Sequence, residues 1–99
     1  MRISEHDKTS IVELVFKIFG SKTQVKLFGS RADDARLGGD IDLLVIVPSD
    51  QLESAKNQKY KFLDELFGKI GEQKVDVIIT TESKIHSDEF LKSLDGISL

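Results

Sequence analysis

Two aspartates separated by one residue, Asp40 and Asp42, stand at the start of an apolar run in this sequence. Side chains alternate along a strand, so both carboxylates would point to one face, with Cβ atoms about 6.5 to 7 Å apart. Like charges beside apolar residues repel each other and resist desolvation. The pair therefore predicts a bound cation.

A third carboxylate, Asp76, interrupts another apolar segment. If the two segments are neighbouring strands, Asp76 would lie about 5 Å across the sheet from the first pair. Three carboxylates without histidine or cysteine fit Mg²⁺, or Mn²⁺, and two such ions support in-line displacement at phosphorus. Asp76 could also act as a general base. The alternative is a solvated residue on an edge strand.

The segment Phe28-Gly29-Ser30-Arg31 offers groups that a triphosphate needs. Gly29 allows close backbone approach, Ser30 adds a hydroxyl and an amide, and a helical turn starting there would present free N–H groups. A glycine and a serine after a strand also form ordinary turns. Phosphate binding is favoured because three features follow one another in the sequence: this turn, the aspartate pair and Asp76.

Two arginines in the same region, Arg31 and Arg36, are candidates for neutralising charge on the transferred group. They equally suit surface ion pairs with Asp33 or Asp34, which would contribute little stability. Their role stays open on the sequence alone.

The elements that must position these residues follow from apolar periodicity. The spacing predicts a helix that contains Ile11 to Phe19 and ends at Gly20, and strands over 24–28, 40–47 and 74–80. Because the polar link 30–39 is short for a helical crossover, we expect a mixed sheet. The fold class is α/β (α+β), one small sheet with helices packed on it.

Two further helices are predicted after the second strand. Asp50 and Glu53 resemble a capping box that opens a long helix, and Phe90, Leu91 and Leu94 suggest a short helix closed by Gly96. Three phenylalanines are expected in the core: Phe62, Phe67 and Phe90.

Composition limits the class of protein. With 99 residues, 39% apolar and 31% charged, the chain predicts one globular domain over 1–99, without a separate acceptor domain. It has no cysteine, so thiolate metal sites are excluded. A net charge of −3 argues against nucleic acid as a direct substrate. No apolar leader or membrane segment is evident, so we expect a cytoplasmic protein.

The sequence resembles the polymerase-beta-type nucleotidyltransferase superfamily, and in particular its minimal (MNT) domains. The resemblance lies in Gly29-Ser30-Arg31 followed by Gly39-Asp40-Ile41-Asp42. The resemblance covers essentially the whole chain. It implies a Gly-Ser turn after the first strand, two divalent metals on Asp40, Asp42 and Asp76, and a nucleoside triphosphate, often ATP, as donor. Gly29, Ser30, Arg31, Arg36 and Gly39 are then the expected nucleotide-binding residues.

The resemblance also implies a partner. Many minimal members resemble antitoxins paired with a helical HEPN toxin, and some transfer AMP to a tyrosine of it, so a hetero-oligomer is expected. This sequence departs from the commoner pattern because Asp33 and Asp34 replace an Arg-Gly pair and Gly39 replaces a serine. These departures bear on the phosphate contacts more than on the metals, and the segment around Asp33 and Asp34 could contact a metal or the partner differently.

Three alternatives remain open from the sequence. The chain could act on a small-molecule acceptor, could neutralise a partner by binding alone, or could hydrolyse phosphate esters with the same metals.

Overall fold

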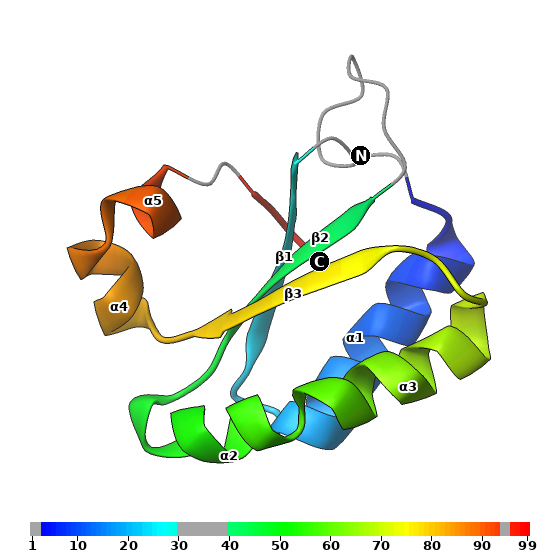
Figure 1. Cartoon of the computed structure of the whole chain (residues 1–99), viewed down its shortest axis with the longest axis horizontal. Helices are drawn as coiled ribbons and strands as arrows, with labels where there is room; N and C mark the ends of the chain where they lie inside the picture. The colour runs from blue at the N-terminus through cyan, green and yellow to red at the C-terminus, as the bar shows by residue number, and fades with distance from the viewer. Residues whose placement is uncertain (1–2, 30–39, 94–95) are drawn as a thin grey trace.

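The computed structural model describes residues 3–29, 40–93 and 96–99, and its centre is a mixed β-sheet (Figure 1). Over these residues the sheet has four strands in the order β3-β2-β1-β4. The strands are β1 (Gln24–Phe28), β2 (Ile41–Ile46), β3 (Val75–Thr80) and β4 (Ile97–Ser98). β1 is antiparallel to β2 and β4, whereas β2 and β3 are parallel. The predicted mixed sheet is confirmed.

The first helix, α1 (Glu5–Phe19), follows its sequence signals closely. The Ser4 hydroxyl accepts a hydrogen bond from the Asp7 amide at 3.1 Å and caps the first turn. Gly20, with φ of 103°, ends the helix, and its N–H donates to the Phe16 carbonyl. The predicted helix and its glycine cap are both confirmed.

The segment after β2 differs from the single capped helix that we predicted. It forms a 3₁₀ turn (Ser49–Gln51), α2 (Leu52–Asn57) and α3 (Lys59–Ile70), with a break at Gln58. The capping box is wrong because Asp50 lies inside the 3₁₀ turn, and Gln51 occupies the N-cap of α2 without a side-chain capping bond in the described part.

The end of the chain also differs. Two short helices, α4 (Glu82–Ser87) and α5 (Glu89–Lys92), replace the one helix expected around Phe90, and Leu94 lies outside the described residues. Thr81 caps α4 and Asp88 caps α5 through their side chains. Phe90 is 61% exposed, so its placement in the core was wrong: four-residue α5 is too short to bury a face.

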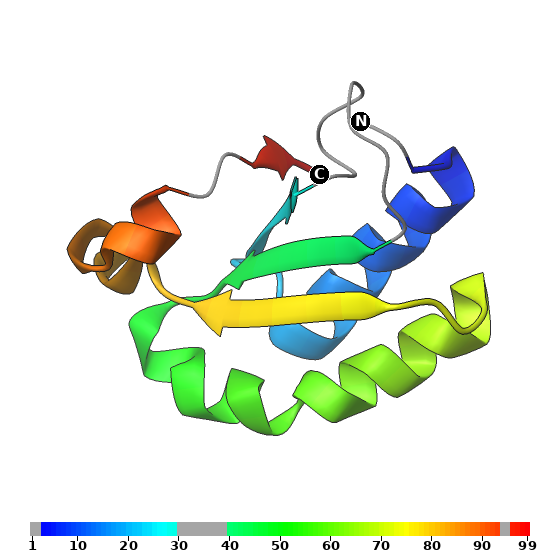
Figure 2. The ribbon, with the colours of Figure 1, turned by 45° about the horizontal axis from the view of Figure 1, so that its top comes forward.

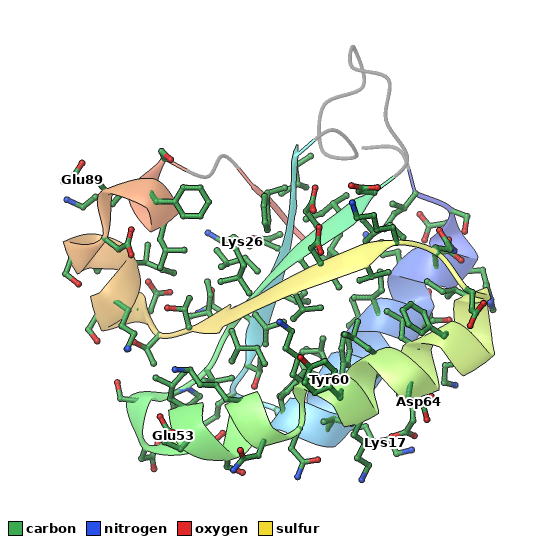
Figure 3. All side chains as sticks on the ribbon, in the orientation of Figure 1. Lys17, Lys26, Glu53, Tyr60, Asp64 and Glu89 are labelled. Atoms are coloured by element: carbon green, nitrogen blue, oxygen red, sulfur yellow. The ribbon has the colours of Figure 1, made fainter. Side chains whose placement is uncertain are left out.

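The core lies between the sheet and the helices α1 and α3, which pack against each other on one face of it (Figure 2). Phe62 of α3 is fully buried, its ring centroid 5.3 Å from that of Phe19, and Phe67 is partly buried against the same core. Lys17, labelled in Figure 3, donates to Glu65 at 2.9 Å and ties the two helices together at the surface.

These elements make a small α+β domain. Within residues 3–29, 40–93 and 96–99, every helix is too short or too polar to cross a membrane.

Candidate active site

Three strands contribute to one row of positions across the sheet. Asp42 on β2 lies opposite Phe28 on β1 and, on its other side, opposite Asp76 on β3. Neighbouring strands are about 4.8 Å apart, so the row spans about 10 Å. The expected position of Asp76, across the sheet from the first carboxylate pair, is confirmed. β3 is also an edge strand of the described sheet, which is what the alternative of a solvated Asp76 assumed.

The centre of this row holds unbalanced negative charge. Partial burial raises the pKa of the Asp42 carboxyl above its usual value, and the charges of Asp76 and Asp40 and a side-chain hydrogen bond with Asp76 raise it further. Lys74 acts in the opposite direction and lowers that pKa. A carboxyl whose pKa rises because other carboxylates lie beside it favours a positively charged ligand.

Asp40 stands one residue before β2 and has a different contact. Its Oδ2 atom lies 3.4 Å from the Nζ atom of Lys74, and the side chains are 43% and 71% exposed. An ion pair this exposed contributes little to stability. The Asp40 carboxylate therefore remains available to a stronger cation.

Gly29 closes the row on the β1 side. Its φ of +76° is a conformation that side chains disfavour. A Cβ added there would lie 3.3 Å from Cγ of Asp42 and would overlap its Oδ2 atom. Only glycine lets the backbone after β1 approach the Asp42 carboxylate this closely.

The carboxylate oxygens of Asp40, Asp42 and Asp76 are the kind of ligand that a hard divalent cation prefers. Their negative charges repel each other, which a bound cation would relieve. In the part of the chain that the structure describes, no three acidic, histidine or cysteine side chains are already gathered to hold a metal ion. Asp42 and Asp76 contact each other, while Asp40 contacts Lys74. Metal binding by all three aspartates stays a prediction.

Several predicted nucleotide-binding residues cannot be placed in this site. Ser30, Arg31, Arg36 and Gly39 lie outside the described residues, as do Asp33 and Asp34. Of the predicted phosphate turn, the structure therefore places Gly29 alone.

Lys74 is the residue that sequence reasoning missed. It lies two residues before Asp76, and alternation along an extended segment would place both side chains on one face. That signal was present, but the contact with Asp40 also depends on the parallel register that pairs Ile41 with Val75.

Comparisons with known proteins bear on the fold and the family. A crystal structure of a candidate nucleotidyltransferase from Sulfolobus solfataricus superposes with a TM-score of 0.53 at 20% identity, covering 99% of this chain and 89% of that one. This likeness supports the fold alone. Among curated proteins, none matches the chain significantly. The sequence profile of the nucleotidyltransferase domain matches residues 9–95, nearly the whole chain. The protein therefore belongs to the nucleotidyltransferase domain family.

Proposed function

We propose that this chain is a metal-dependent nucleotidyltransferase that moves a nucleoside monophosphate, AMP from ATP, onto a hydroxyl of a partner protein. The observation that carries the proposal is the row across the sheet, in which Asp42 lies between Gly29 on one side and Asp76 on the other. A donor phosphate at the Gly29 end and an acceptor hydroxyl at the Asp76 end would face each other across Asp42.

Asp40, Asp42 and Asp76 are the residues that would hold two Mg²⁺ ions, with Mn²⁺ as an alternative. When bound, these ions supply charge neutralisation on the triphosphate and make the acceptor hydroxyl easier to deprotonate. The raised pKa of Asp42 supports this assignment, since a cation would relieve the repulsion that raises it.

The reaction follows from the order of the residues in the row. The acceptor oxygen attacks the α-phosphorus, and the bond from that phosphorus to the oxygen bridging to the β-phosphate breaks, so pyrophosphate leaves. The acceptor proton passes to the carboxylate of Asp76, the most exposed member of the row and hence the one open to an incoming group. Lys74, close to the carboxylates, supplies positive charge at the rim.

The partner that we propose is a helical toxin of the HEPN type, which this chain would neutralise as an antitoxin in the cytoplasm. The resemblance of Gly29-Ser30-Arg31 and Asp40-Ile41-Asp42 to the minimal domains of this superfamily supports such a partner.

The test uses ATP labelled at the α- or the γ-phosphate, with Mg²⁺ and the purified product of the neighbouring gene. We expect α-label on that protein and release of pyrophosphate, with Asp42→Asn lowering the rate by about 10³-fold. Asp50→Asn, an exposed aspartate in the 3₁₀ turn, is the matched control and should leave the rate unchanged.

Each alternative has its own outcome. Release of inorganic phosphate without α-label would indicate hydrolysis, and α-label on an added small molecule alone would indicate another acceptor. If Asp40→Asn/Asp42→Asn still neutralises the toxin in a growth assay, binding alone accounts for neutralisation. Full transferase activity of Asp42→Asn would overturn the proposed site.

A further inference from the structure

A groove of about 370 Å³ runs along β3, on the side of that strand away from β2. Three consecutive strand residues, Val77, Ile78 and Ile79, form one wall. Lys56 of α2 and Lys59 of α3 form the other, on either side of the helix break at Gln58. Figure 2 shows α2 and α3 running along β3 at this place.

The strand wall of this groove has backbone groups without a partner strand in the described sheet. The Ile41 amide donates to the Lys74 carbonyl at 3.0 Å, and the Val47 amide donates to the Thr80 carbonyl at 2.9 Å. In a parallel pair of strands, every second residue forms the backbone hydrogen bonds to the neighbouring strand. Since Lys74 and Thr80 bond to β2, Val77 and Ile79 direct their backbone N–H and C=O groups away from β2, to the outer edge. This edge suits an extended segment of another chain.

The two lysines determine which segment would fit. Neither Lys56 nor Lys59 forms a salt bridge with another described residue, although the whole chain has a net charge of −3. Lysines beside an edge strand discourage indiscriminate pairing. Val77 belongs to the core and is only 5% exposed, whereas Ile78 and Ile79 are partly exposed in the groove. A segment with carboxylates would be attracted to the ammonium groups, whereas a basic one would be repelled.

The groove lies on the acceptor side of the catalytic row. It begins at Val77, directly after Asp76, and the strand order places Gly29 on the far side of Asp42. If the donor triphosphate occupies the Gly29 end, in-line attack requires the acceptor to arrive from the β3 side. The side chain of Asp76 lies on the face of the sheet opposite to that of Val77. A strand paired with this edge would present alternate side chains to the two faces, so that one set meets the lysines and the other lies beside Asp76.

We infer that the groove formed by Lys56, Lys59 and Val77 to Ile79 is the docking site for the acceptor protein, through an extended segment that carries acidic and apolar side chains. The inference rests on the proposed transferase function for its direction of approach. The docked segment presents a hydroxyl to Asp76, and its carboxylates contact the two lysines.

Binding can be measured apart from catalysis with a synthetic probe. Fluorescein-labelled poly(Glu,Tyr), which has carboxylates, aromatic rings and phenolic hydroxyls, is titrated with the protein by fluorescence anisotropy, without ATP or metal. We expect Lys56→Glu/Lys59→Glu to weaken binding by about 10-fold or more. Lys84→Glu/Lys92→Glu makes the same charge change on α4 and α5 and should change binding less than about 2-fold.

A second readout locates the probe. In ¹H–¹⁵N NMR spectra, the amides of Val77, Ile78 and Ile79 should shift on addition of poly(Glu,Tyr), and poly(Lys,Tyr) should leave them unchanged. Equal binding by Lys56→Glu/Lys59→Glu and wild type, shifts centred elsewhere, or no binding of poly(Glu,Tyr) to the wild type would overturn the inference.

Asp42→Asn separates this inference from the proposed function. This variant should bind poly(Glu,Tyr) as the wild type does. If the probe binds in the groove but no nucleotide is ever transferred, the transferase proposal fails and docking stands. If transfer occurs while Lys56→Glu/Lys59→Glu binds and labels the acceptor normally, docking fails and the transferase stands.

Discussion

The two faces of the sheet are made by alternate residues of the same strands, yet only one of them carries the carboxylates Asp42 and Asp76. On the face that α1 and α3 cover, Leu43 and Val45 of β2 are fully buried. On the other face, which we call the outer face, Asp42 of the same strand is partly exposed and Asp76 of β3 is exposed. Farther along β2, Leu44 and Ile46 on the outer face are buried as well. The charges are therefore confined to the first residues of β2 and β3, where burial elsewhere lets the fold hold groups that it disfavours.

The largest effect on stability should come from breaking the covered face. Phe62→Ala removes a fully buried ring that packs on Phe19, and we expect a loss of about 3 to 4 kcal/mol, or a fall in Tm of about 15 to 25 °C. Thermal unfolding followed by circular dichroism measures it. Tyr60→Ala, on the same helix but 78% exposed, is the control and should cost less than about 0.5 kcal/mol. Similar losses in both variants would contradict the account of the core.

A smaller effect of opposite sign is expected on the outer face. Because the pKa of Asp42 is raised in the folded protein, its ionised form opposes folding, and this cost disappears as the pH falls through the raised pKa. Asp42→Asn should therefore stabilise the metal-free protein at pH 7 by about 0.5 to 1 kcal/mol after allowance for solvent screening. Urea unfolding in EDTA checks it, and the gain should shrink toward pH 4. A loss of stability at pH 7 would show that the Asp42 charge is compensated.

The contrast between the faces also explains which parts of the fold were predictable. The predicted bounds of β1 match the structure, and those of β2 and β3 were correct to within one residue, because apolar residues alternate or run continuously there. The break at Gln58, the helix α4 and the two-residue β4 were missed. Their short length gives little periodicity, and tertiary contacts decide them.

The same limit applies to the candidate site. Asp42 was predictable from its place at the start of an apolar strand, while Asp76 required the assumption that β2 and β3 are neighbours. The contact between Lys74 and Asp40 and the groove beside Lys56 and Lys59 depend on register and on the helix break. The strand register and the helix break leave no local pattern in the sequence, although alternation does place Lys74 on the same face as Asp76.

The central claim is that the row from Gly29 through Asp42 to Asp76 is the metal-binding centre of the enzyme, and paramagnetic Mn²⁺ tests it most directly. In ¹H–¹⁵N NMR spectra of the ¹⁵N-labelled protein, substoichiometric Mn²⁺ should broaden the amide signals of Gly29, Asp42 and Asp76 before all others. The double variant Asp42→Asn/Asp76→Asn should lose this selective broadening while it keeps the fold. Broadening centred instead on other carboxylates, such as Asp88 and Glu89, or unchanged in the double variant, would contradict the claim.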